Sequence, residues 1–235
     1  MKNKPWRFAL QASGELEIFL YDVIGEDLFG GTSAAAFQEE LSAAGNLRSI
    51  RLRVNSPGGN AFDGIAIYNA LLSHGARVTA QVDGLAASIA STIIMAASEI
   101  AMADNSMMMI HNPYAGLVGD AAEMRRMAGA LDNMKKSMVA AYQRHTARSA
   151  DEVSAMMDAE TWMGAEEAED AGFCETILTP EQPVAMAASI DLSRFRHIPA
   201  AFAARLRPHP EGDASQLLLA DREKKRLQLE LLKRL

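Results

Sequence analysis

Short runs of apolar and β-branched residues alternate with longer amphipathic segments over residues 1–180 of the chain. The short runs predict strands, which are expected at residues 6–24 (two strands around a turn), 49–54, 78–82, 99–103, 106–110 and 173–177. Segments with apolar residues three or four positions apart predict helices, which are expected at residues 33–44, 60–74, 92–97, 120–145, 149–157 and 165–171. Strands and helices that alternate at such short intervals favour right-handed β-α-β crossovers. The expected fold class is therefore α/β with a largely parallel sheet.

More detailed expectations concern the helix at 60–74, the longest helix and residues 158–162. The apolar face of the helix at 60–74 is expected to consist of Ile65, Tyr68, Leu71 and Leu72. The longest helix is expected to begin at Asp120, which together with Glu123 has the spacing of a capping box. Its apolar residues keep helical spacing from Met124 to Tyr142. Residues 158–162 are expected to form a loop or turn.

The character of the chain changes after residue 180. Five of the eight prolines fall within residues 180–210, so this part is expected to be extended. Residues 216–235 are rich in leucine, lysine and arginine, and they predict an amphipathic helical tail that packs on a neighbouring subunit or partner. The expected organisation is a main domain at residues 1–180, a Pro-rich extended segment at 181–215 and the tail at 216–235.

Composition and charge narrow the possible classes of function. The net charge is −7 and no basic run interrupts the main body, which argues against binding of nucleic acid. No apolar stretch is long enough to span a bilayer and no signal peptide is evident, so no membrane contact is expected. The single cysteine allows no intramolecular disulfide and fits a reducing, cytoplasmic compartment. No cluster of residues has the spacing of metal ligands, so neither a metal nor a cofactor is expected.

The stretch Gly84–Ser91 is the first candidate for chemistry. It follows the strand predicted at 78–82 and leads into the apolar run at 92–97, so Ser88 is expected at a strand-to-helix turn. The unpaired N–H groups of a first helical turn and the positive end of the helix dipole stabilise nearby negative charge, which suits a nucleophilic hydroxyl. The same place is also that of an ordinary helix N-cap. This stretch alone does not separate the two interpretations.

A nucleophilic serine needs a base and donors for the oxyanion. Of the five histidines, His111 is the best candidate for the base, because it ends an apolar strand and Pro113 turns the chain away after it. The turn Pro57-Gly58-Gly59 ends another strand, and its glycines let a substrate approach exposed N–H groups closely. Ile89, beside the nucleophile, would supply a second N–H group. Taken singly, these features are also typical of a structural histidine and of a tight turn before a helix.

Together, these stretches resemble the family of the ClpP proteolytic subunit, and more closely the ClpP-related head-maturation (prohead) proteases of tailed phages. The matching stretches lie in the family's order within residues 15–180, and they are Val54–Gly59, Gly84–Ala90, Met109–Pro113 and Trp162–Gly172. The resemblance implies a ClpP/crotonase-like fold of repeated β-β-α units, with the long helix after His111 as a helical handle where two rings meet. It also implies a serine endopeptidase without cofactors that forms a ring-shaped homo-oligomer and cleaves proteins or peptides.

The resemblance assigns a role to individual residues. Ser88 falls on the position of the nucleophile and His111 on that of the base. The N–H groups of Gly59 and Ile89 fall on the oxyanion hole. The backbone segments that pair with an extended substrate are represented by Gly58, Asn60, Ala61, Asn112 and Pro113.

The third member of the triad is an acid that orients the histidine. The family usually has an aspartate shortly before the Ser-Ala or Thr-Ala turn that opens the next helix, and in register that residue is Glu160. A glutamate can orient an imidazole as an aspartate does, given room for one more methylene group. Asp158 is the alternative acid if the loop is rearranged.

Departures from the family bear on the biological role. The N-terminus has no obvious counterpart to the loops with which ClpP engages its ATPase, and residues 181–235 have no counterpart in a compact ClpP subunit. Both favour a phage-type protease that acts on capsid or scaffold chains, in the host cytoplasm or inside the prohead. The alternatives are a housekeeping ClpP-type subunit that works with an ATPase unfoldase, a crotonase-type acyl-CoA enzyme, and a catalytically inert ring.

Overall fold

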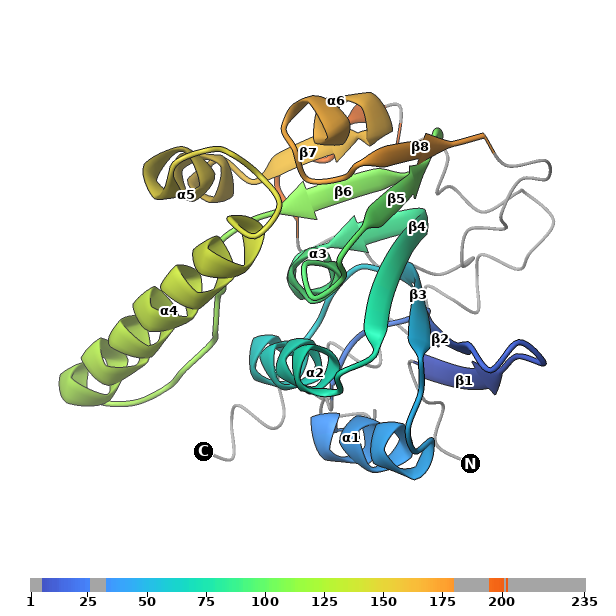
Figure 1. Ribbon diagram of the computed structural model, residues 1–235. Helices are drawn as coiled ribbons and strands as arrows, with labels where there is room; N and C mark the ends of the chain where they lie inside the picture. The colour runs from blue at the N-terminus through green and yellow to red at the C-terminus, as the bar shows by residue number, and fades with distance from the viewer. Residues whose placement is uncertain (1–5, 26–32, 180–194, 201, 203–235) are drawn as a thin grey trace, which may run out of the picture. The chain divides into compact units, whose positions relative to one another are not determined.

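The fold is built on one mixed sheet of eight strands (Figure 1). The computed structural model describes residues 6–25, 33–179, 195–200 and 202. The strands are β1 (Trp6–Leu10), β2 (Leu16–Leu20), β3 (Ser49–Ser56), β4 (Arg77–Ala87), β5 (Ile100–Ala103), β6 (Met107–Ile110), β7 (Thr161–Gly164) and β8 (Thr176–Leu178). The helices are α1 (Ala34–Ala43), α2 (Ala61–Ser73), α3 (Ile89–Ile94), α4 (Ala121–Tyr142), α5 (Ala150–Asp158) and α6 (Ala165–Asp170).

The sheet is parallel over most of its width. Its main path runs β1-β2-β3-β4-β5-β8, and only the β1–β2 hairpin on this path is antiparallel. Strand β6 pairs with the far end of β4, beyond β5, and then with β7 in antiparallel fashion. The predicted α/β class and largely parallel sheet are therefore confirmed.

One face of the sheet is apolar and is covered by helices. On β3, Ile50, Leu52 and Val54 are fully buried, and the alternate positions carry arginines. This period of two is what directs one side of a strand into the core and the other side away from it. Helices α1, α2 and α3 lie against the apolar face (Figure 1).

The opposite face carries charges that are paired across neighbouring strands. Arg53 Nη2 lies 2.6 Å from Asp83 Oδ1, and the Asp83 side chain is fully buried. Tyr21 donates its hydroxyl to Asp83 Oδ2 at 2.6 Å, and burial, reinforced by this bond, raises the pKa of Tyr21. A buried carboxylate is costly unless it is paired in this way, so the three side chains hold β2, β3 and β4 together as a unit.

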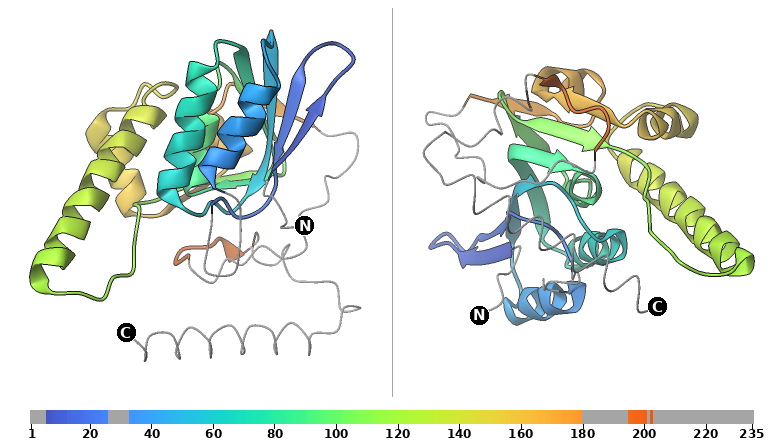
Figure 2. Two further views of the ribbon diagram at one scale, coloured as in Figure 1. Left: turned by 90° about the horizontal axis from the view of Figure 1, so that it is seen from below. Right: turned by 180° about the vertical axis from the view of Figure 1, so that it is seen from behind.

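Helix α4 extends away from the sheet in all three views (Figures 1 and 2). It begins with the predicted capping box, in which Asp120 and Glu123 each bond the backbone of the other. Only its second half is anchored, through residues that include Met134, Met138 and Tyr142. Met124, in the first half, is 52% exposed, so the apolar stripe of this helix continues well beyond the core.

Three detailed predictions differ from the structure. The buried face of α2 consists of Gly64, Ile67, Ala70 and Leu71, whereas Leu72 is 38% exposed. The predicted face is therefore correct at Leu71 and, with partial burial, at Ile65 and Tyr68, and it is wrong at Leu72. It missed Gly64 and Ala70 because it weighted large apolar side chains, whereas α2 packs closely on α3. The expected loop at 158–162 ends earlier, because Thr161 already pairs with Ile110 in the sheet. Strand β4 also runs to Ala87, directly before the candidate nucleophile.

Residues up to Pro199 belong to one compact unit, which contains all of the elements named above. The predicted Pro-rich segment and amphipathic tail lie outside the described residues, apart from 195–200 and 202. Within the described part of the chain, no helix is long and apolar enough to cross a membrane.

Tyr142 anchors α4 to α3 and generates a first prediction. Its fully buried hydroxyl accepts from Thr92 Oγ1 at 3.1 Å and lies 2.8 Å from Ser91 Oγ. We expect Tyr142→Phe to lower the free energy of unfolding by about 1–2 kcal/mol at pH 7, since two buried hydroxyls lose a partner. Chemical denaturation measures this loss. Tyr68→Phe is the control, because the half-buried Tyr68 hydroxyl bonds no other described side chain.

The same tyrosine should also make stability depend on alkaline pH. Burial raises the pKa of Tyr142 from 10.0 to about 12. The folded protein therefore keeps the phenol proton while the unfolded chain loses it, so stability falls as the pH rises from 10 towards 12. Tyr142→Phe should show a shallower fall than the wild type over this range. Equal slopes would contradict the assigned burial of the phenol.

Candidate active site

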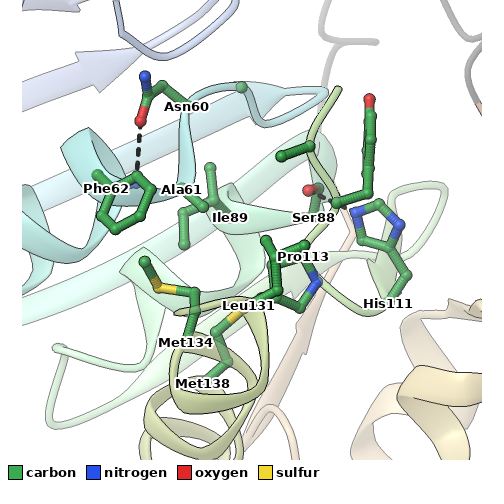
Figure 3. Close-up of a pocket in the computed structure, with 13 residues that line it drawn as sticks. Asn60, Ala61, Phe62, Ser88, Ile89, His111, Pro113, Leu131, Met134 and Met138 are labelled. Carbon is green, nitrogen blue, oxygen red and sulfur yellow. Dashed lines mark hydrogen bonds between the residues drawn. The ribbon is translucent and has the colours of Figure 1, made fainter. Parts of the chain in front are cut away.

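The pairing of β4 with β6 brings Ser88 and His111 together. Ala87, the last residue of β4, is in register with Met109, and the Ser88 N–H donates to the Met109 carbonyl at 2.9 Å. Because parallel strands end at the same edge of a sheet, the residues that follow them lie side by side. His111 Nε2 lies 2.7 Å from Ser88 Oγ, and Figure 3 shows the hydroxyl directed at the imidazole.

The backbone of Ser88 has an unusual conformation. Its φ of 57° and ψ of −130° are rarely adopted by residues other than glycine. Ser88 occupies the N-cap position of α3, but its side chain makes no capping bond and meets His111 instead. Ser91 Oγ bonds the Ser88 carbonyl at 2.5 Å and so helps to hold this turn. Strain of this kind, about 1–3 kcal/mol, is typical of functional positions.

The glycine turn after β3 passes directly beside this serine. Ile24 forms an isolated bridge with Gly59, in which its N–H donates to Gly58 and its carbonyl accepts from Asn60, both at 2.8 Å. This bridge leaves the Gly59 N–H out of the pairing. Among the described residues, neither the Gly59 nor the Ile89 N–H donates to another backbone group. Two such N–H groups near a hydroxyl can bind a developing oxyanion.

A cavity of about 260 Å³ lies in front of Ser88. Gly59, Ile89 and His111 line it together with Ser88. Its opposite wall is apolar and includes Leu131, Met134 and Met138 from α4, and Figure 3 shows these side chains facing the cavity. The site therefore offers a reactive hydroxyl, a base, two N–H groups and an apolar recess in one place.

The pairing of β6 with β7 brings Glu160 to the cavity that His111 lines. Ile110 pairs with Thr161 at the end of this antiparallel ladder, and His111 and Glu160 are the residues directly beyond that pair. Glu160 is 9% exposed, and its φ of 52° is the left-handed value that non-glycine residues seldom adopt. Of the two candidate acids, Glu160 is thus the buried one and the one directly beside the β6–β7 ladder.

The Glu160 carboxylate is held by hydrogen bonds from a segment far along the chain. Its Oε1 accepts from the backbone N–H groups of Arg196 at 2.6 Å and His197 at 2.8 Å. Trp162 Nε1 also donates to Oε1, at 3.4 Å. Glu160, His111 and these two backbone residues line a second cavity of about 550 Å³.

Asp158, the alternative acid, has other partners. Its Oδ1 accepts from Asn112 Nδ2 at 2.7 Å and from Lys135 Nζ at 2.6 Å. These two bonds, the one from Asn112 first, lower the pKa of the exposed Asp158 carboxyl. Asp158 also lines the second cavity, but it is the last residue of α5 and lies outside the β6–β7 ladder.

Four of the five predicted substrate-pairing residues line the two cavities, and Gly58 lines neither of them. Asn60, Ala61 and Pro113 line the cavity at Ser88, and Asn112 and Pro113 line the one at Glu160. The Asn60 side chain caps α2, because its Oδ1 accepts from the N–H groups of Phe62 and Asp63.

Several contacts at the site were not predicted from the sequence. The His111 ring lies between two aromatic edges, Tyr114 at 5.8 Å and Phe195 at 5.7 Å between ring centroids. The backbone donors at Arg196 and His197 carry no sequence signal at all, because every residue except proline has an N–H group. The helical spacing of Met134 and Met138 predicted a packed face but not that part of this face lines the cavity.

A serine hydroxyl bonded to an imidazole, on an α/β fold and beside two N–H groups, is the arrangement of a serine-type hydrolase. A model of the Clp protease family matches residues 14–181. The chain therefore belongs to the Clp protease family, and it is a serine-type peptidase.

Its relatives have matching names. The chain is 28% identical over 174 residues to the "ATP-dependent Clp protease proteolytic subunit" of Bacteroides fragilis, covering 70% of this chain and 84% of the relative. The subunit of the same name from Bacteroides thetaiotaomicron is also 28% identical over 174 residues, with coverage of 70% and 79%. The "ATP-dependent Clp protease proteolytic subunit 1" of Salinibacter ruber is 28% identical over 140 residues, with coverage of 59% and 60%. The predicted family and enzyme class are confirmed, while the closer likeness to prohead proteases stays a prediction.

The close approach of Gly58 to Ser88 generates a second prediction. A Cβ atom at Gly58 would lie 2.7 Å from both the Ala87 carbonyl and Ser88 Cβ. We expect Gly58→Ala to reduce the rate of labelling by a fluorophosphonate about 10²-fold, because a shift of about 1 Å in a reacting group has that effect. Gly75→Ala is the control, since Gly75 has a similar φ of 80° but open space around it. That variant should lose about 1–2 kcal/mol of stability and keep its labelling rate.

Proposed function

We propose that the protein is a serine endopeptidase whose catalytic triad is Ser88, His111 and Glu160. The observation that carries this proposal is the 2.7 Å contact between Ser88 Oγ and His111 Nε2 in a cavity that the Gly59 and Ile89 residues also line. A hydroxyl becomes nucleophilic at neutral pH only when a neighbouring base accepts its proton, and His111 is placed to do so.

The reaction proceeds through an acyl-enzyme. Ser88 Oγ attacks the scissile carbonyl carbon while His111 Nε2 takes the hydroxyl proton. The tetrahedral oxyanion accepts hydrogen bonds from the N–H groups of Gly59 and Ile89. The imidazolium then protonates the leaving amine, the C–N bond breaks, and the acyl group stays on Ser88. Water attacks the ester by the same route, which releases the acid product and restores the hydroxyl.

Glu160 orients the base and stabilises the imidazolium that forms during each step. The register of β6 and β7 and the burial of Glu160 support this role. Asp158 is less suited to it, because it is exposed and already bonded to Asn112 and Lys135.

The substrate is an extended polypeptide with an apolar residue before the scissile bond. Leu131, Met134 and Met138 support this preference, because they form the apolar wall of the cavity that begins at Ser88. The backbone of Gly58–Ala61 on one side and of Asn112–Pro113 on the other would pair with the substrate main chain, as strands do at a sheet edge.

The protein acts as a homo-oligomeric ring, with the possibility of two stacked rings that meet through α4. The apolar side chains that α4 and the residues before it leave exposed support this assembly, since Val118 is 74% and Met124 is 52% exposed. The relatives' printed name, "proteolytic subunit", supports it as well. Those relatives are described as ATP-dependent. In the reaction proposed here a nucleotide has no part, so an ATPase unfoldase would serve only to deliver folded substrates.

The setting that we propose is maturation of a phage prohead, with capsid or scaffold chains as substrates. Residues 182–235 support this setting, because they follow the part of the chain that the Clp family model matches. An enzyme confined with its substrate at high local concentration needs no unfoldase to find it.

The assignment of the nucleophile gives a third prediction. A fluorophosphonate probe should label the wild-type protein covalently, and Ser88→Ala should abolish labelling while the size of the oligomer is unchanged. Ser98→Ala, which removes an exposed hydroxyl outside both cavities, is the matched control and should label like the wild type. Undiminished labelling of Ser88→Ala would overturn the assignment.

The same samples separate the alternative functions. Cleavage of an unfolded protein without nucleotide supports the ATP-independent peptidase, and cleavage only with an added unfoldase supports a housekeeping-type subunit. Turnover of acyl-CoA without labelling would indicate a crotonase-type enzyme, and an intact oligomer inert to all of these reagents would indicate a vestigial site.

The apolar wall of the cavity gives a fourth prediction. Leu131→Arg places a positive charge in the recess, so cleavage after leucine should fall about 10-fold and cleavage after glutamate should rise. A panel of peptides that differ only in the residue before the scissile bond measures both changes. Leu10→Arg adds the same charge at a position that is 67% exposed and outside the cavity, and it should leave the preference unchanged.

A further inference from the structure

A short segment beyond the family-matched region contacts two members of the proposed triad. Residues 195–199 belong to the same compact unit as the sheet, although the Clp family model ends at residue 181. Three consecutive residues of this segment, Phe195, Arg196 and His197, reach the site. We call them the clamp.

The clamp holds Glu160 through its backbone. The N–H groups of Arg196 and His197 converge on a single carboxylate oxygen, Oε1, at 2.6 and 2.8 Å. Hydrogen bonds from N–H groups to a carboxylate are about twice as strong as those between neutral groups. Two of them on one oxygen restrict the rotation of the carboxyl group.

The clamp also contacts the base. The Phe195 ring meets the His111 ring edge-on, with centroids 5.7 Å apart and planes at 75°. The same Phe195 ring packs on Trp162, at 5.6 Å and 82°, and Tyr114 lies on another side of the imidazole. Aromatic pairs of this geometry are worth about 0.5–1.5 kcal/mol beyond their buried area. The imidazole is therefore confined by two aromatic neighbours as well as by Ser88.

We propose that the clamp, Phe195–His197, is a positioning element of the active site, which holds Glu160 and His111 in the geometry that activates Ser88. This inference rests on the proposed function and adds to it a backbone site outside the family-matched region. The clamp touches neither the substrate carbonyl nor the reacting hydroxyl, and it acts only through the acid and the base.

The chemistry of Glu160 explains why such an element is needed. A glutamate has one more rotatable bond than an aspartate, so its carboxyl group samples more positions unless other groups restrain it. Glu160 also has a positive φ, a backbone conformation that residues other than glycine seldom adopt. Two rigid N–H donors replace the restraint that a shorter side chain would have supplied.

Proline substitution tests the backbone donors, which is the fifth prediction. Arg196→Pro removes both the side chain and the N–H group, whereas Arg196→Ala removes the side chain alone. With a peptide substrate in the full-length protein, we expect kcat of the proline variant to be at least about 10-fold below that of the alanine variant, because a misplaced triad acid weakens proton transfer. KM should agree within about twofold between the two. His197→Pro and His197→Ala form a second matched pair in case the first proline disturbs folding.

A double-mutant cycle shows whether the clamp acts through the acid. If it does, Arg196→Pro should lower kcat much less in a Glu160→Ala background than in the wild-type background, since the group that it positions is already gone. Equal effects in both backgrounds, or equal kcat for Arg196→Pro and Arg196→Ala, would overturn the proposal.

A measurement without catalysis keeps this inference separate from the proposed function. Hydrogen exchange of the peptide that contains residues 195–199 should be slow in the wild-type protein and in the inactive Ser88→Ala variant, and faster in Glu160→Ala. Asp158→Ala is the matched control, because Asp158 lies on the same turn and bonds neither clamp N–H group. If exchange of this peptide does not respond to Glu160→Ala, the clamp is excluded even when the probe labels Ser88. If exchange is faster in Glu160→Ala but the probe does not label Ser88, the contact between the clamp and Glu160 stands and the proposed peptidase function is rejected.

Discussion

The parallel pairing of the end of β4 with β6 is the constraint on which the rest of the site depends. It is a short ladder, and it is continued by one hydrogen bond from the Ser88 N–H to the Met109 carbonyl. That bond fixes the turn at Ser88 relative to the end of β6, so the distance between nucleophile and base follows from the sheet and not from flexible loops. A site on strand ends is held more rigidly than one built on loops alone.

The pairing of β6 with β7 has the same importance for the position of the proposed acid, Glu160. An antiparallel register that is shifted by one residue would turn the side chains of β7 to the opposite face and displace Glu160 from the cavity that it shares with His111. The register is held by the pairing of Ile110 with Thr161 and by the burial of Met163. Strand β6 thus has a parallel neighbour, β4, that Ser88 follows and an antiparallel neighbour, β7, that Glu160 precedes, while His111 follows β6 itself.

Much of the fold could be predicted from the sequence because its signals are local. The apolar alternation of β3 and the capping box of α4 involve residues a few positions apart, and both occur as expected. The face of α2 was predicted only in part, because close packing of two helices selects small residues, which a scale of hydrophobicity ranks low. The candidate residues Ser88, His111 and Glu160 could be named from motif order, but the contacts that hold them depend on register, which no local pattern contains.

The clamp shows most clearly what a local pattern cannot contain. Glu160 and the Arg196 N–H are 36 positions apart, and a backbone donor is the same group in almost every residue. The segment can therefore vary in sequence and still supply the bonds, provided that no proline occupies either donor position. A motif search finds residues whose side chains take part in a reaction, so it does not find a partner that contributes only its main chain. For a triad that uses glutamate in place of aspartate, such a main-chain partner offers a physical reason why the longer side chain can still orient the base.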